Sequence, residues 1–122
     1  MDTKQKEYYN KMLKKGRLVH FHDGSILKCF ITFYIGNDDN KYIRENPWEL
    51  LNDEPDMGQV CYVDQCISDK NVDNPFEIWN TFKKIVIDKF PQIKEFKWNR
   101  FKNGEVNRYN YKLKGEEMSC IQ

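Results

Sequence analysis

The chain has 122 residues, with 20 basic and 19 acidic side chains, and 15% of its residues are aromatic. A domain usually holds about 100 to 200 residues, so this length predicts one domain over residues 1–122 and excludes modular architectures. The aromatic content supplies enough large apolar surface to fill a core, which excludes global disorder. The balanced charge excludes a basic nucleic-acid footprint along the whole chain.

Apolar runs and cysteines indicate the compartment. No apolar run approaches the roughly 18 residues that cross a bilayer, and the N-terminal segment lacks the apolar centre of a secretory signal. We therefore expect a cytoplasmic protein without a membrane partner. The cysteines are irregularly spaced, and three of them lie in strand-like apolar runs, which favours reduced thiols over a disulfide framework or a zinc site; they are Cys29, Cys61, Cys66 and Cys120.

The first third of the chain predicts a helix and then a β-hairpin. Tyr8 and Met12 recur at helical spacing among lysines in residues 3–15, and Gly16 ends this pattern. Residues 17–22 and 25–36 favour strands and are separated by Asp23-Gly24, a strong hairpin signal. Alternate residues of the second run are apolar, so we expect that face to be buried; they are Leu27, Cys29, Ile31, Phe33 and Ile35.

The middle of the chain predicts an acidic loop and a central strand. Residues 37–58 hold seven acidic side chains against two basic ones, and Asn46-Pro47-Trp48-Glu49 predicts the start of a short helix. Residues 59–67 are apolar on both faces except at Asp64, which predicts a strand covered on both sides. Strict alternation places Cys61, Val63 and Ile67 on one face and Val60, Tyr62 and Cys66 on the other.

The last part of the chain predicts a helix and a second hairpin. Asn74-Pro75-Phe76-Glu77 has the same cap pattern and precedes a broad apolar helical stripe over residues 75–90, which Pro91 ends. Residues 93–101 and 106–114 predict two strands joined through Asn103-Gly104. The strand-helix-strand unit predicts a right-handed crossover between parallel strands. The fold class is therefore α+β, with a mixed, mostly antiparallel central sheet.

Asp64 is the first candidate for a catalytic residue. A strand covered on both faces directs this carboxylate into a covered layer, and buried carboxylates with perturbed pKa values cluster at functional sites. The structural alternative is that Asp64 pairs with an Arg or His of a neighbouring strand or orders the adjacent loop. His20 and His22 share one strand face, which suits a metal pair or a general base beside Asp64, or simply an exposed strand face.

Two segments are candidate ligand sites. The start of the helix over residues 75–90 offers unpaired backbone N–H groups to a phosphate, although Asp73 and Glu77 are able to satisfy these donors instead. Residues 83–114 hold ten basic side chains against three acidic ones, with interleaved aromatic residues. This pattern suits single-stranded nucleic acid, and the alternative that we prefer is a solvated strand face balanced by the acidic segment.

Three stretches together point to a known fold. They are the hairpin over residues 16–30, the strand over residues 58–64, and Lys89-Phe90-Pro91 before a strand that ends at Arg100. Over residues 16–114 the chain resembles the acyl-CoA N-acyltransferase (GNAT) fold, and within it the toxin-activating lysine acyltransferases and related small proteins common in phage genomes. The resemblance implies one GNAT-like domain, without a metal, in the cytoplasm of a bacterium or of a phage host.

The resemblance also implies a reaction. It is the transfer of an acyl group from a thioester carrier, acyl-CoA or acyl carrier protein, to an amine. A base then takes the amine proton while backbone N–H groups of the central strand polarise the thioester carbonyl. By this resemblance Asp64 orients or deprotonates the amine, and Tyr62 or a tyrosine of the last hairpin protonates the leaving thiolate. Backbone N–H groups hold the carrier near Cys66, Asn74 and Phe76.

Two departures from the family define the alternative function. The family's pyrophosphate signature, Arg/Gln-x-x-Gly-x-Gly/Ala, is missing at residues 68–75, where it falls by position. Residues 1–15 also lack the histidine that the toxin-activating enzymes carry in an N-terminal helical segment. The alternative is therefore a non-catalytic accessory protein of a phage or mobile element with this fold. It acts by binding a protein, either as an inhibitor of a host or defence factor or as a particle component.

Overall fold

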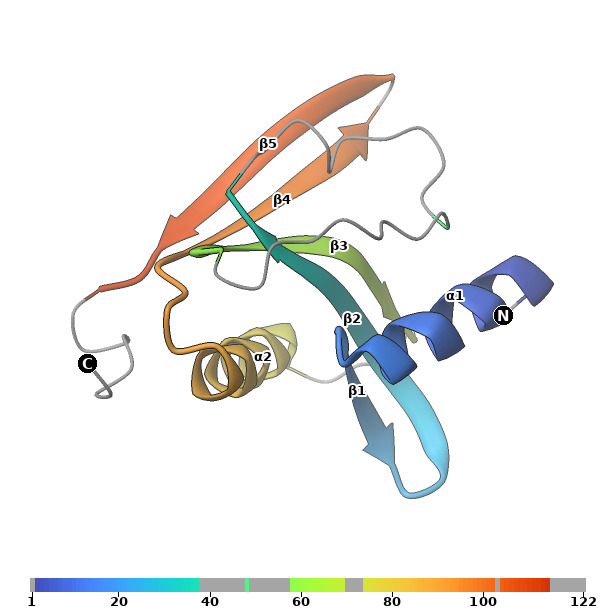
Figure 1. Ribbon diagram of the computed structural model, residues 1–122. Coiled ribbons are helices and arrows are strands. Elements are labelled where there is room, and N and C mark those ends of the chain that lie inside the picture. The colour runs from blue at the N-terminus through green and yellow to red at the C-terminus, as the bar shows by residue number, and fades with distance from the viewer. Residues whose placement is uncertain (1, 38–47, 49–57, 70–73, 103, 115–122) are drawn as a thin grey trace.

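The computed structural model describes residues 2–37, 48, 58–69, 74–102 and 104–114. Figure 1 labels two helices and five strands in the order that the sequence predicts. They are α1 (Thr3–Lys15), β1 (Leu18–Asp23), β2 (Ile26–Gly36), β3 (Val60–Ser68), α2 (Pro75–Lys89), β4 (Glu95–Lys102) and β5 (Glu105–Lys112). The short helix expected to begin at Asn46-Pro47 lies outside the described residues. Of that segment the structure describes Trp48, whose ring packs edge-on against Tyr8 with the ring centroids 5.4 Å apart.

The five strands form one sheet in the order β1-β2-β3-β4-β5. β3 and β4 are parallel, and every other neighbouring pair is antiparallel. This arrangement confirms the predicted α+β class with a mixed, mostly antiparallel sheet. Parallel neighbours need a crossover connection, and α2 provides it between β3 and β4. β3 is consequently the middle strand, as the sequence predicts.

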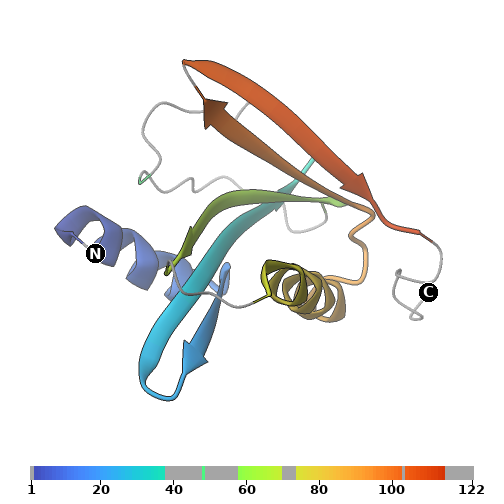
Figure 2. The same ribbon diagram turned by 180° about the vertical axis from the view of Figure 1, so that it is seen from behind.

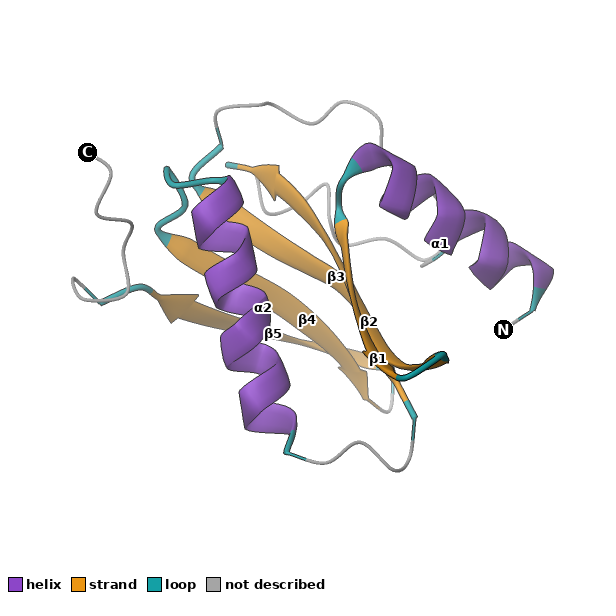
Figure 3. Cartoon of the chain, turned by 90° about the horizontal axis from the view of Figure 1, so that it is seen from below, coloured by secondary structure: helices purple, strands orange, loops and turns teal. Residues whose placement is uncertain are grey.

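One helix packs against each face of the sheet, as Figure 3 shows. The core on the α2 side is apolar and includes Cys61 of β3 and Phe82 of α2, both fully buried. The core on the α1 side is more polar and consists of Tyr8, Met12, Tyr34 and Tyr62. Neither described helix has the length and apolar character that crossing a bilayer requires.

β2 is buried on both faces from Cys29 onward, which confirms the predicted buried face and adds a second one. The predicted apolar face packs on α2, and the residues between are buried as well, because α1 and its tyrosines cover the second face. Tyr9 of α1 meets Phe30 edge-on, with the ring centroids 5.1 Å apart. The buried residues on this second face are Phe30, Thr32 and Tyr34.

A β-bulge in β3 changes the predicted alternation of its side chains. Thr32 of β2 pairs with Gln65, whereas the next residue pairs with Val63, so that Asp64 is an extra residue in β3. Beyond the bulge Cys66 pairs with Ile31 and therefore lies on the α2 face, and Ile67 pairs with Phe30 on the α1 face. The sequence placed Cys66 and Ile67 on the opposite faces, because strict alternation cannot anticipate an extra residue.

Candidate active site

β3 and β4 separate partway along their length. The two strands pair from Val60 with Glu95 to Val63 with Trp98, and beyond this point the described strands do not pair with each other. β3 nevertheless continues to Ser68 and β4 to Lys102. Figure 1 shows the two strand ends diverging, and Figure 2 shows the same divergence from behind. We call the point after Val63 and Trp98 the fork.

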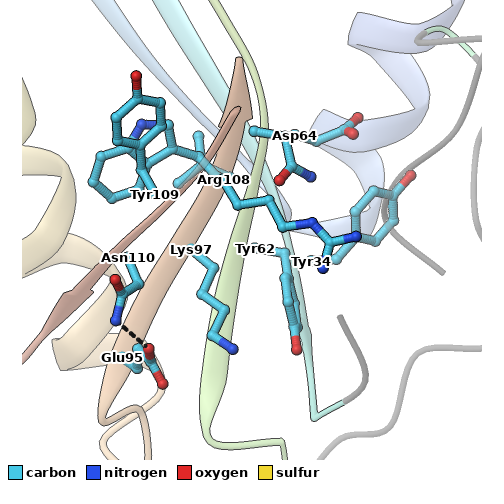
Figure 4. A pocket seen from close by; sticks show the side chains of 11 residues that line it. Tyr34, Tyr62, Asp64, Glu95, Lys97, Arg108, Tyr109 and Asn110 are labelled. Atoms are coloured by element: carbon cyan, nitrogen blue, oxygen red, sulfur yellow. Dashed lines mark hydrogen bonds between the residues drawn. The ribbon is translucent and has the colours of Figure 1, made fainter. Parts of the chain in front are cut away.

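A pocket of about 190 Å³ opens beside the fork. Ligand sites for drug-sized molecules usually measure about 300–1,000 Å³, so this pocket suits a small molecule or the reacting end of a larger one. Figure 4 shows that its labelled side chains come from four strands. They include Tyr34 from β2, Tyr62 and Asp64 from β3, Glu95 and Lys97 from β4, and Arg108 from β5.

A directed series of hydrogen bonds holds the Asp64 carboxylate. The Tyr8 hydroxyl donates to Asp64 Oδ2 and lies 2.6 Å from Thr32 Oγ1. Because the single phenolic proton goes to Asp64, the Thr32 hydroxyl must donate to Tyr8. Thr32 Oγ1 in turn accepts a hydrogen bond of 3.1 Å from the backbone N–H of Gln65, next to the bulge. The bulge and α1 thus orient the carboxylate together.

Tyr8 keeps its proton in this environment. Burial, the charge of Asp64 and the hydrogen bond to Asp64 all raise the pKa of Tyr8 above its usual value of 10.0. Desolvation and a neighbouring anion both disfavour the phenolate, so the phenol remains a donor at neutral pH. Tyr8 is therefore a fixed hydrogen-bond donor to Asp64, whereas Asp64 is the group in this pair that is able to accept a proton.

Of the site residues predicted from the sequence, the pocket brings together Asp64 and Tyr62. Tyr62 is 5% exposed and pairs across the sheet with Tyr34. The three residues predicted to hold the carrier lie outside the pocket lining. Cys66 is exposed on β3 beyond the fork, and Asn74 and Phe76 lie in the first turn of α2. Figure 3 shows this turn at the same end of the sheet as the separated ends of β3 and β4.

The first turn of α2 satisfies part of its own hydrogen-bonding capacity. Asn74 is the N-cap residue, and its Oδ1 accepts a hydrogen bond of 3.2 Å from the backbone N–H of Glu77. Asn74 Nδ2 also donates to Glu77 Oε2 at 3.4 Å. Asn74 itself thus accepts from a backbone donor of this turn, whereas the Glu77 carboxylate bonds to the Asn74 side chain, and Asp73 lies outside the described residues. A role of Asn74 in carrier binding stays a prediction.

The two histidines lie away from the pocket. His20 and His22 are exposed on the edge strand β1, and β2 separates them from β3. His20 Nδ1 lies 2.8 Å from the Tyr9 hydroxyl and 3.1 Å from His22 Nε2. Neither histidine lines the pocket beside Asp64. Within the parts of the chain that the structure describes, no cluster of three or more His, Cys, Asp or Glu side chains could hold a metal ion.

Sequence reasoning missed Tyr8 and the charged residues of the last hairpin. Tyr8 looked like an ordinary residue of an apolar helical stripe, and nothing in the sequence links it to Asp64. The sequence predicts a polar strand face in the last hairpin, but it does not predict that this face lines a pocket together with Asp64. The members of this face are Glu95, Lys97 and Asn99 of β4, opposite Lys112, Asn110 and Arg108 of β5.

Comparisons with known proteins find no family model that matches this chain, and no significant match among curated proteins. The features of the chain that bear on its function are the fork, the pocket beside it and the hydrogen bonds that orient Asp64.

Proposed function

We propose that the chain is a GNAT-like N-acyltransferase, which moves an acyl group from a thioester carrier to an amine. The carrier in this proposal is acyl-CoA or an acyl carrier protein, and the reaction takes place in the cytoplasm. The observation that carries the proposal is the fork, where the parallel strands β3 and β4 part and Asp64 follows directly. A fold alone does not define an activity, whereas the side chains beside the fork limit the chemistry that can take place there.

The fork supports thioester binding because the pairing between β3 and β4 stops beside the pocket. Beyond Val63 and Trp98 the facing edges of β3 and β4 do not pair with each other within the described strands. In the proposed complex a thioester carbonyl at this edge accepts a hydrogen bond from a backbone N–H of β3. One such donor typically contributes about 10²–10³ to the rate, because it stabilises the oxyanion of the transition state.

Asp64 and Tyr62 provide the proton transfers in the proposed reaction. The amine nitrogen bonds to the acyl carbon, the carbon–sulfur bond of the thioester breaks, and the amine proton passes to the Asp64 carboxylate. The Tyr62 hydroxyl protonates the leaving thiolate, and Asp64 then returns a proton to Tyr62 through water. Both side chains line the same pocket, and Tyr8 orients the carboxylate throughout.

Carrier binding is the first test of this proposal. A ligand at 100 times its dissociation constant stabilises a protein by about 2.7 kcal/mol. We therefore expect acetyl-CoA or a longer acyl-CoA to raise the midpoint of thermal unfolding in a saturable manner. If neither acyl-CoA esters nor an acylated carrier protein shifts the midpoint, the non-catalytic accessory protein becomes the better account.

The second test is the substitution Asp64→Asn, which keeps the size of the side chain and removes its ability to take a proton. We expect acyl transfer to an amine, followed by release of the carrier thiol, to fall by about 10²–10⁴-fold. The matched control is Asp69→Asn, because Asp69 is exposed, forms an ion pair with Lys28 and lies outside the pocket. Unchanged turnover of Asp64→Asn would remove Asp64 from the mechanism.

A further inference from the structure

The pocket beside the fork presents charges of both signs. Asp64 and Glu95 contribute carboxylates, and Lys97 and Arg108 contribute cations. Figure 4 shows the Arg108 side chain extending away from its own strand, with its guanidinium on the side of the pocket where Tyr34 and Tyr62 lie. A ligand in this pocket therefore meets an anion from β3 and a cation from β5.

The two carboxylates already have neutral hydrogen-bond partners. Asp64 accepts from the Tyr8 hydroxyl, and Glu95 Oε2 accepts a hydrogen bond of 3.0 Å from Asn110 Nδ2. In the described part of the chain, Arg108 forms neither an ion pair nor a hydrogen bond. A guanidinium carries five N–H donors in a planar fork that matches a carboxylate with two parallel hydrogen bonds. Arg108 thus has the chemistry to bind a carboxylate that the protein itself does not supply.

We propose that the amine acceptor is a small zwitterion of the amino-acid class, with its amine at Asp64 and its carboxylate at Arg108 and Lys97. This inference rests on the acyltransferase function proposed above and names the acceptor. The volume of about 190 Å³ admits a small amino acid and excludes a folded protein segment. Holding the carboxylate at Arg108 also keeps it from competing with the amine for the acyl carbon.

The size of the pocket limits the side chain of this acceptor. The buried rings of Tyr34 and Tyr62 line it on the α1 side of the sheet. The rings of Trp98 and Tyr109 are stacked on the other side of the sheet, where Trp98 also contacts Trp79 of α2. A volume of about 190 Å³ leaves little room beyond the amine and the carboxylate of the acceptor. We therefore expect glycine, alanine or serine to bind better than amino acids with large side chains.

The test is direct binding to the full chain without any thioester, so that it does not depend on catalysis. Calorimetric titrations compare alanine with ethylamine, which lacks the carboxylate, and with propionate, which lacks the amine. We expect alanine, glycine or serine to bind at least tenfold more tightly than either fragment. A further titration uses inorganic phosphate, because a phosphate group of the carrier is the other anion that Arg108 is able to bind.

Two variants assign the binding to this pocket. Arg108→Gln should weaken amino-acid binding at least tenfold and leave ethylamine binding unchanged. Lys112→Gln is the matched control, because Lys112 is an exposed cation on the same strand and does not line the pocket. The unfolding midpoint of each unliganded variant is measured in parallel, and Arg108→Gln should match the control because the Arg108 side chain is exposed.

The outcomes separate the two proposals. Amino-acid binding that Arg108→Gln weakens supports the amino-acid site at Arg108, even if no acyl transfer is found and the proposed function fails. Acyl transfer to a lysine peptide with no amino-acid binding overturns this inference and leaves the proposed function standing. Tighter binding of phosphate than of any small amino acid also overturns it, because Arg108 would then serve the carrier.

Discussion

The hydroxyl of Tyr8 in α1 donates a hydrogen bond to the carboxylate of Asp64 in β3, and 56 positions of sequence separate the two residues. The same hydroxyl accepts from Thr32 in β2, so one phenol joins three elements of the fold. α1 therefore does more than cover the sheet: it fixes the acid that lines the pocket.

We expect Tyr8→Phe to lower the free energy of unfolding by about 1–3 kcal/mol, because it removes the buried hydrogen bonds that the Tyr8 hydroxyl forms with Asp64 and Thr32. Tyr9→Phe is the matched control, since Tyr9 is on the same helix and bonds to His20 near the surface. It should cost less than about 1 kcal/mol. Urea unfolding of the two variants measures the difference. Equal midpoints would mean that the bond to Asp64 contributes no stability.

Cys66 should be the most reactive thiol of the described residues. The residue is exposed, and a hydrogen bond from Cys29 and the charge of Arg100 lower the pKa of Cys66 from 9.0 to about 7, although partial desolvation of the thiol opposes this shift. The hydrogen bond to Cys66 and burial raise the pKa of Cys29. Only the thiolate is alkylated, so the rate at Cys66 should rise with a midpoint near pH 7 in the folded protein.

Alkylation by iodoacetamide over a pH series, followed by peptide mass mapping, checks this expectation. Arg100→Gln should move the midpoint of Cys66 upward because it removes a stabilising positive charge. Arg108→Gln is the matched control, because it also removes one positive charge, but from β5 instead of β4. A midpoint near 9.0 in the unsubstituted protein would contradict the contribution of Cys29 and Arg100.

Lys83 and Lys84 are neighbours on α2 with different expected contributions to stability. Lys83 is 7% exposed, and its Nζ lies 4.1 Å from the centroid of the Tyr111 ring, whereas Lys84 is exposed. Lys83→Ala loses a cation–π contact and the packing of the aliphatic stem, so it should lower stability by about 1–3 kcal/mol. Lys84→Ala should stay within about 0.5 kcal/mol of the unsubstituted protein. Thermal unfolding of both variants tests whether the buried stem matters.

Gly58 allows a close approach of two backbone segments. A Cβ at this position would lie 2.5 Å from the Cα and the N of Gly36, a distance that backbone atoms cannot relieve without moving β2. Gly58→Ala should therefore lower the free energy of unfolding by about 1–3 kcal/mol. The adjacent exposed Gln59 provides the control Gln59→Ala. Denaturant midpoints that agree for the two variants would show that the close approach tolerates a methyl group.

The sequence by itself determined the secondary structure elements and their connections. Asp23-Gly24 marks a hairpin that forms where predicted, and Gly104 takes the positive φ of 77° that its turn needs. Pro75 at the start of α2 and the apolar stripe behind it define that helix, whose end falls within one residue of the predicted boundary. These are local signals, in which backbone freedom and side-chain period act over a few residues, and so they can be recognised without the fold.

The tertiary structure alone decided the geometry of the site. The bulge at Asp64, the fork after Val63 and Trp98, and the bond from Tyr8 each depend on how β3 meets β2, β4 and α1. The position of the Arg108 guanidinium likewise depends on the path of β5 beside β4. Strand twist, register and contacts between distant residues set these features. The order of residues along the chain does not contain this information. For this reason the sequence analysis named Asp64 and Tyr62 as candidate site residues but not Tyr8 or Arg108.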